Sequence, residues 1–383
     1  MMEVDFDAVR PYNDHEVREA IPRILADSKF NAMMDYLFEP QKKQEIIEKL
    51  PEAEGVTDFQ EILTLPAVEK ILSDTTDGIH SSGYEHISPE SHYIFVANHR
   101  DIILDSSILG LSHLKKGYRV TQTTWGNNLM INQLIVDLGK SNQMITVFRE
   151  GTPKELLHNS QRLSTYMRYS SVVQNNSIWI AQRKGRTKDG SDKTDVTILK
   201  MLSLSGEGDF LESLKEINLT PLAISYEWEP CDAMKVREIY LSQQGAYEKQ
   251  PDEDFKSIIG GVLGQKGGVH LAIGTPLSET IGQLDLAQLT HNEILAEIAG
   301  TIDEQIYTHY HLWPSNYLAF DLLNNTENYR HHYTEDTLAH LNERYDHTTA
   351  VVGKDNEEIK NLFLKLYANP VINKLKVLDK IEK

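Results

Sequence analysis

Cysteine and long apolar runs are scarce in this chain of 383 residues. Its one cysteine, Cys231, excludes a disulfide within the chain, which permits a reducing setting. No apolar run approaches the roughly 18 to 20 residues that span a bilayer as a helix. The opening stretch MMEVDFDAVRPYND is acidic and has no apolar segment, so we expect no secretory signal. Together these absences predict a cytoplasmic protein without membrane-spanning helices.

Basic charge is also in short supply. The 38 Lys and Arg residues face 57 Asp and Glu, a net charge of -19. This balance argues against a nucleic-acid partner, because phosphates require clustered basic side chains. The deficit is uneven, since residues 81–227 hold 16 basic and 15 acidic side chains. Within that segment the basic residues crowd one stretch, namely Arg183, Lys184, Arg186, Lys188 and Lys193. We interpret the stretch as a local anion site, and a solvated basic loop is the alternative.

The apolar pattern divides the chain into three parts. Residues 1–80 predict helices interrupted by prolines, and residues 284–383 become helical again. Between them, in 81–283, short apolar runs alternate with helical stretches. This alternation predicts an α/β domain with a mostly parallel central sheet flanked by helices. The expected strands are the runs at 93–97, 118–122, 144–148, 177–181, 221–226 and 269–273.

The first of these strands delivers an imidazole to its end. In SHYIFVANHRDIILDSSILGL the apolar run stops abruptly at Asn98 and His99. Two acids, Asp101 and Asp105, follow at short range, just where an apolar helical pattern begins. A histidine at a strand end with a carboxylate nearby is the arrangement that holds a general base. A surface histidine in an ordinary strand-to-helix loop is the alternative.

Two later strands end in basic residues. Phe148 and Arg149 close the run MITVF, and ligands usually bind at the carboxyl ends of parallel strands. After the run SIWIA, Gly185 permits a turn that lets Arg186 approach an anion. A guanidinium can hold a phosphate with two parallel hydrogen bonds. A surface ion pair is the alternative for Arg149.

Taken in order, His99 with its following acid, Phe148 and Arg149, the Gly185–Arg186 loop and Pro221 resemble the four sequence blocks of the glycerolipid acyltransferases. The similarity extends over about 91–277, where GVHLAIGTPL is similar to the closing strand of that family. It implies an enzyme in which His99 is the catalytic base, oriented by Asp105 or Asp101. The residues that the resemblance implies for the acceptor phosphate are Arg149, Arg183, Gly185, Arg186 and Lys193, and those for the acyl site are Phe148 and Pro221.

The chain departs from the family pattern in two places. The family spacing is His-x4-Asp, whereas Asp105 lies one residue further from His99 and Asp101 lies only two residues away. We favour Asp105, because the Ser-Ser-Ile-Leu run behind it sits as the family's helix does, and Asp101 stays open. In the third block the family often has Glu where this chain has Arg183 or Lys184. The loop is therefore more basic, which favours phosphate binding.

The resemblance implies transfer of a fatty acyl group from a thioester, acyl-CoA or acyl carrier protein, to a hydroxyl of 1-acylglycerol 3-phosphate, giving phosphatidate. Glycerol 3-phosphate is the alternative acceptor, because the run WIAQRKGR and the lack of a spanning helix are similar to the soluble enzymes that acylate it. A non-catalytic lipid-binding protein on the same fold is a further alternative. We expect no metal and no bound cofactor. We also expect peripheral contact with the inner face of the membrane.

Two other enzyme classes fit poorly. The letters HRD at 99–101 resemble a protein-kinase catalytic loop, but the Asn expected five residues after Asp101 is Ser106. No Gly-rich loop precedes it, and DFG does not occur. A serine hydrolase of the α/β type requires Gly-x-Ser-x-Gly, which the sequence lacks. The sequence therefore favours acyl transfer over both.

Overall fold

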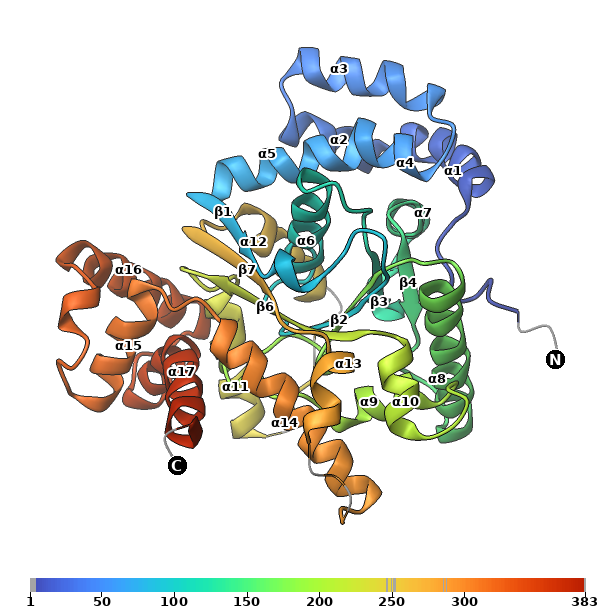
Figure 1. Ribbon diagram of the computed structural model, residues 1–383. Helices are drawn as coiled ribbons and strands as arrows, with labels where there is room; N and C mark the ends of the chain where they lie inside the picture. Colours follow the sequence, from blue (N-terminus) through green and yellow to red (C-terminus); the bar gives the residue numbers. More distant parts are fainter. Residues whose placement is uncertain are drawn as a thin grey trace.

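The computed structural model describes residues 5–245, 247–248, 250, 253–284, 286 and 288–381. At its centre is a seven-stranded sheet in the order β1-β7-β6-β2-β5-β3-β4 (Figure 1). The strands are β1 (Gly78–Ser82), β2 (Ile94–Ala97), β3 (Gln122–Gly126), β4 (Met144–Val147), β5 (Ile178–Ala181), β6 (Leu219–Tyr226) and β7 (Gly268–Ile273). Neighbouring strands run parallel except β6 and β7, which are antiparallel. The predicted class, a mostly parallel sheet flanked by helices, is confirmed.

Helices cover both faces of the sheet and both ends of the molecule (Figure 1). Before β2 lie α1 (Asp14–Ala26), α2 (Ser28–Leu37), α3 (Pro40–Lys49), α4 (Val56–Phe59) and α5 (Leu65–Thr75). Between β2 and β7 lie α6 (Leu104–Lys115), α7 (Gln133–Ser141), α8 (Pro153–Arg168), α9 (Val196–Ser203), α10 (Phe210–Glu216), α11 (Asp232–Gln244) and α12 (Glu253–Leu263). After β7 lie α13 (Leu277–Thr280), α14 (His291–His309), α15 (Pro314–Asn324), α16 (Glu335–Val352) and α17 (Glu357–Ile381).

Strand β2 shows how the two apolar layers form. All four of its residues are buried, and successive side chains point to opposite faces. Ile94 and Val96 join a cluster with α8, α9, α10 and α14, whereas Phe95 and Ala97 join one with α5 and α6. Burial on both faces explains why a central parallel strand is uniformly apolar. Because β2 lies between β6 and β5, whatever follows it lies near the middle of the sheet.

Two further apolar clusters lie outside the sheet. One joins α1 to α5 with α7, and the other joins α11 with α15, α16 and α17. In Figure 1 these groups are the blue helices along the top and the red helices at the left. The helical character of both terminal regions is therefore present. The division at residues 80 and 283 stays a prediction; β1 extends across the first of these positions, and α14 packs against the sheet.

Two strands differ from the prediction. The run at 118–122 is not a strand over its length, because the ladder of β3 begins only at Gln122. Tyr118 instead packs on the rings of Tyr84 and His113 and donates a hydrogen bond to the Ile87 carbonyl. Strand β1 was not predicted, because GIHSS is a polar edge strand without an apolar run. Apolar runs therefore locate buried strands better than polar or edge strands.

No helix among the described residues is long and apolar enough to cross a membrane.

Candidate active site

Beyond the last ladder pair of β2, hydrogen bonds from the Asn98 side chain and the His99 backbone hold the end of the strand in place. Asn98 is fully buried; its Oδ1 accepts a hydrogen bond from the Ile224 N–H at 2.7 Å, and its Nδ2 donates to the Ile224 carbonyl at 2.9 Å. The His99 carbonyl accepts from the Thr187 N–H at 2.8 Å, in the loop after β5. These bonds attach Asn98 to β6 and His99 to the loop that follows β5. The position of His99 is thus set by the sheet and not by a free loop.

His99 is paired with Asp105. Its Nδ1 lies 2.8 Å from Asp105 Oδ2, and its ring packs edge-on against Trp179 with centroids 5.2 Å apart. A carboxylate only accepts hydrogen bonds, so the contact favours the tautomer protonated at Nδ1 and leaves Nε2 with a lone pair. No described residue makes a hydrogen bond with Nε2. With the His99 side chain 11% exposed, Nε2 is available to a substrate hydroxyl.

The extra residue in the His99–Asp105 spacing is absorbed by a short turn. Asp101 Oδ1 accepts from the N–H groups of Ile103 at 2.9 Å and Leu104 at 2.8 Å, where α6 begins. Asp101 therefore holds the N–H groups at the start of the helix, and among the described residues its carboxylate makes no hydrogen bond to His99. Burial and the nearby Asp105 raise the pKa of Asp101, against the lowering effect of Arg186. The structure thus brings Asp105 to the imidazole and assigns Asp101 to the helix start.

Asp105 itself is held by four donors. Its Oδ2 accepts from the backbone N–H of Arg100 at 2.6 Å and of Asp101 at 3.0 Å in addition to His99. Its Oδ1 accepts from the Tyr226 hydroxyl at 2.7 Å. Such a carboxylate has one orientation, so it fixes the imidazole as well. Tyr226 did not stand out in the sequence analysis, because nothing in a single strand indicates that β6 lies beside β2.

The third-block loop lies against His99. It follows β5, and Gln182 N–H donates to the Ala97 carbonyl at 2.8 Å while Thr187 bonds to His99. Gly185 has φ +74°, a conformation that favours glycine, and Arg186 directly after this turn is close enough to Asp101 for its charge to lower the pKa of that carboxyl. Nη1 of Arg186 is buried and makes no hydrogen bond within the described residues. A buried guanidinium nitrogen without a partner is a donor that an anionic ligand can use.

The other predicted phosphate residues are spread along the carboxyl edge, meaning the ends of the parallel strands. Arg149 follows β4, three strands from β2, or roughly 14 Å at about 4.8 Å per strand. Its guanidinium lies over Gly126, where a Cβ would come 2.8 Å from Nε, and burial lowers its pKa against the effect of Asp254. Lys193 is exposed and its charge acts on Asp303 of α14, whereas Arg183 acts on Asp189. Arg186, in contrast, acts on Asp101, two residues after His99, and lowers the pKa of that carboxyl.

Phe148 and Pro221 have packing roles. Phe148 is partly buried against the apolar cluster that holds β2 and α8. Pro221 lies within β6, which begins two residues earlier than predicted, at Leu219. Its carbonyl accepts from the Gly274 N–H, so its nitrogen faces the β7 side, where pairing starts only at Leu222. The missing N–H of proline therefore interrupts no bond to β2.

A buried ion network lies behind His99 and was not predicted. The guanidinium of Arg100 is fully buried between Asp192 and Glu229, with Nη1 at 2.8 Å from Glu229 Oε2. Lys235 also pairs with Glu229 and donates to the Arg100 carbonyl at 2.7 Å. Burial alone would lower the pKa of Arg100, but the two carboxylates outweigh it and raise the pKa. The network joins the loops that follow β2, β5 and β6, so it braces the three loops around His99.

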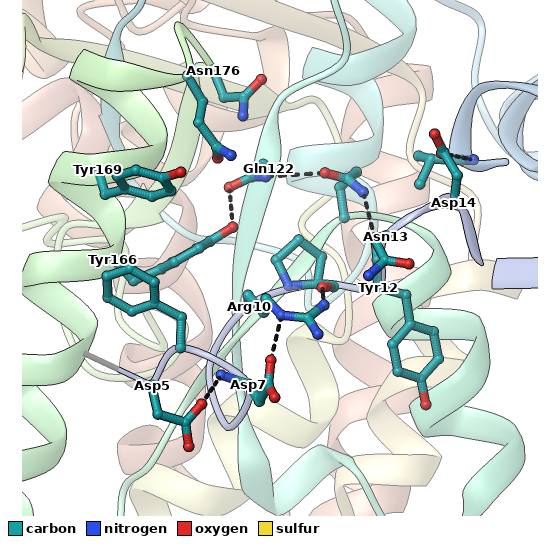
Figure 2. Close-up of a pocket in the computed structure, with 15 residues that line it drawn as sticks. Asp5, Asp7, Arg10, Tyr12, Asn13, Asp14, Gln122, Tyr166, Tyr169 and Asn176 are labelled. Carbon is teal, nitrogen blue, oxygen red and sulfur yellow. Dashed lines mark hydrogen bonds and ion pairs between the residues drawn. The ribbon is translucent and has the colours of Figure 1, made fainter. Parts of the chain in front are cut away.

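A large cleft lies elsewhere. Its volume is about 800 Å³, and it is lined by the chain entering α1 together with Gln122, Gln143, Tyr166 and Asn176 (Figure 2). These residues stand at or before the amino ends of β3, β4 and β5, the edge opposite to His99. Gln122 is already bonded to Tyr166, Ser170 and Gln143. None of the predicted site residues lines this cleft.

In the described part of the chain, no group of three or more His, Cys, Asp or Glu side chains is arranged to hold a metal ion.

Comparisons with known proteins give one structural match to report. No protein-family model matches the sequence. A search of curated proteins likewise finds no match. Among solved structures, the fold is similar to the 1-acyl-sn-glycerophosphate (LPA) acyltransferase PlsC from Thermotoga maritima, with 13% sequence identity and a TM-score of 0.37. The match covers 76% of this chain and 92% of that one. At this TM-score the function has to be argued from the side chains of the site.

Proposed function

We propose that this protein is an O-acyltransferase of phospholipid synthesis that acylates a hydroxyl of 1-acylglycerol 3-phosphate and releases phosphatidate. The observation that carries the proposal is the His99–Asp105 pair at 2.8 Å with Nε2 unpartnered among the described residues. A second is Arg186, whose buried Nη1 lacks a partner in the neighbouring loop. A base and a guanidinium with one buried, unused donor nitrogen, held by loops that bond to each other, suit an acceptor that carries both a hydroxyl and a phosphate.

The proposed reaction follows from the tautomer of His99. Nε2 accepts the proton of the acceptor hydroxyl while its oxygen attacks the thioester carbonyl carbon. Asp105 stabilises the imidazolium that forms, as the carboxylate does in hydrolase triads, with the substrate oxygen in the place of the serine. When the tetrahedral intermediate collapses, the C–S bond breaks and the imidazolium returns its proton to the leaving thiolate. An ester and a free thiol result, and no covalent enzyme intermediate is needed.

In this proposal, binding the phosphate of the acceptor orients its hydroxyl toward His99. Arg186 is the primary ligand in this proposal, with Arg149 at the same edge and Arg183 and Lys193 as outer cations. Holding the phosphate fixes the hydroxyl beside Nε2, which converts an encounter between two molecules into an intramolecular step. Gly185 contributes the turn that precedes Arg186. The donor is acyl-CoA or acyl-acyl carrier protein.

The test is direct transfer with purified protein. Labelled acyl-CoA and labelled acyl-acyl carrier protein are each incubated with 1-acylglycerol 3-phosphate and with glycerol 3-phosphate. Labelled phosphatidate is the expected product. Labelled lysophosphatidate alone would move the assignment to glycerol 3-phosphate, which the helical N-terminal region and the WIAQRKGR run favour. No transfer to either acceptor would refute the enzyme and favour a lipid-binding protein.

We also propose peripheral membrane contact through one face of α12, on the cytoplasmic side. Phe255, Ile259 and Leu263 are 49%, 41% and 41% exposed and stand at successive turns, and we name them the α12 stripe. The opposite side of the helix lies on the site, since a Cβ at Gly261 would come 2.0 Å from Asp101 Oδ2. An amphipathic helix beside the carboxyl edge would present His99 to lipid substrates at the bilayer surface. Apolar insertion also suits a protein whose net charge of -19 opposes anionic lipid.

Replacing the three stripe residues with serine should reduce vesicle binding by about a hundredfold, because each lost insertion is worth about 1 kcal/mol and each 1.4 kcal/mol is about tenfold. Co-sedimentation with phosphatidylcholine vesicles measures it. A matched triple variant at Val173, Leu322 and Leu378, exposed apolar residues on other elements, should bind as wild type does. Equal binding by both triple variants and the wild type would exclude α12 as the contact.

A further inference from the structure

We infer that Tyr226 is a positioning residue for acyl transfer: its hydroxyl holds the Asp105 carboxylate in the orientation that aligns His99. The inference rests on the proposed function for its kinetic consequences. Its structural part concerns only the coupling between Tyr226, Asp105 and His99, which can be measured without turnover.

The two oxygens of Asp105 have different partners. Oδ2 receives three donors from its own loop, His99 Nδ1, Arg100 N–H and Asp101 N–H. Oδ1 receives one, the Tyr226 hydroxyl at 2.7 Å, from a strand 121 residues further along the chain. Asp105 is 1% exposed, so little solvent can replace a missing donor. The Tyr226 hydroxyl is therefore the donor that pairs Oδ1 and sets the rotation of the Asp105 carboxylate plane.

Tyr226 is built to remain a donor. It is the last residue of β6, is 1% exposed, and is paired in register with Val269 of β7. Burial and the charge of Asp105 raise the pKa of its phenol well above the usual value. The hydroxyl thus stays protonated across the working pH range, and a carboxylate partner can only accept from it. Since the ring is buried in the cluster with α6, Tyr226 acts on His99 through Asp105 and not on substrate.

The bond from Tyr226 also reduces the negative charge that Asp105 presents to His99. A donor to Oδ1 draws negative charge away from the carboxylate, so losing it leaves a more negative partner for the imidazolium. The protonated form of His99 is then favoured, and a higher pH is needed before His99 can act as a base. A purely structural tyrosine would lower stability without moving this pH dependence.

Tyr226→Phe tests the inference with kinetics and with a titration. We expect kcat to fall about tenfold with KM within about twofold, and the acid limb of the pH–rate profile to move up by about half a unit. Proton NMR of the His99 ring should show its titration midpoint moving in the same direction, whether or not the protein turns over. Combining Tyr226→Phe with Asp105→Asn should add less than about twofold to the loss from Asp105→Asn alone, because Tyr226 acts through that carboxylate.

Tyr12→Phe is the matched control. Tyr12 also donates to a buried carboxylate, Asp137 Oδ1, at 3.0 Å, and it lies beside the cleft at the edge opposite to His99. It should lower the melting temperature without moving the pH profile or the His99 titration. An unchanged profile and titration in Tyr226→Phe would overturn the inference, as would equal shifts in both variants. If the wild-type protein transfers no acyl group but Tyr226→Phe still moves the His99 titration midpoint, the proposed function is refuted and the positioning role is retained.

Discussion

Replacing His99 with alanine is expected to reduce acyl transfer by about a thousandfold, within the range that general-base catalysis and triad histidines contribute. His99 is the acceptor of the hydroxyl proton in the proposed reaction, and no other histidine in the described structure is paired with Asp105. The fold should survive, because Asp105 keeps its bonds to Tyr226 and two backbone N–H groups. Single-turnover transfer of a labelled acyl group measures the loss, and circular dichroism checks the fold.

His92→Ala is the matched control for that experiment. His92 lies in the segment just before the amino end of β2, and it bonds to Asn175 and to the Glu216 carbonyl. It belongs to the edge opposite to His99, so its removal should leave the transfer rate within about twofold of wild type. A wild-type rate in His99→Ala would remove the imidazole from the mechanism. Equal losses in both variants would indicate a folding defect in place of a catalytic one.

How far the sequence predicts this fold depends on how each strand is buried. Central strands such as β2 and β5 are apolar on both faces, so short runs of Ile, Val, Phe and Trp reveal them. Strand β3 begins with Gln122, which is buried but bonded to Tyr166, Ser170 and Gln143. A polar residue satisfied by distant partners is invisible to a pattern of apolar runs. The strand was therefore predicted four residues too early.

The candidate site was predictable only within its local loops. The run after β2 indicates His99 and its two acids, because all of them lie within seven residues. Tyr226, Asp192 and Glu229 come from loops and strand ends more than ninety residues away. Tyr226 meets Asp105, and the two acids meet Arg100, only because β6 and β5 flank β2. Strand order follows from the packing of the whole domain. A single sequence therefore suggests the base but not the residues that hold it.

Asp192, in the basic loop after β5, is another residue whose partner a single sequence does not reveal. In the sequence it lies in the same stretch as the five basic residues from Arg183 to Lys193, where an acid lowers the net positive charge. In the structure it is buried and bonds to Arg100 and Asn98. Its charge is taken up by Arg100, so the loop presents more net positive charge to a ligand than its composition indicates. This adds to the support for phosphate binding at Arg186.

Asp105→Asn and Asp101→Asn are expected to differ by two orders of magnitude or more in activity. Asparagine at 105 has an NH2 donor in place of one carboxylate oxygen, and an NH2 facing Nδ1 favours the wrong imidazole tautomer, which in triads costs about ten thousandfold. At 101 the acid only caps α6, and asparagine is as good a cap as aspartate. Asp101→Asn should therefore keep its rate within about tenfold of wild type.

The same pair of variants decides which acid orients His99. Both positions are buried and both substitutions preserve side-chain size, so melting temperatures provide a common measure of folding. Rates are compared at saturating acceptor, and the Nδ1 proton of His99 is followed by NMR in each variant. A large loss in Asp101→Asn with a small one in Asp105→Asn would reverse the assignment. It would mean that the 2.8 Å contact between His99 and Asp105 is not the contact that operates in catalysis.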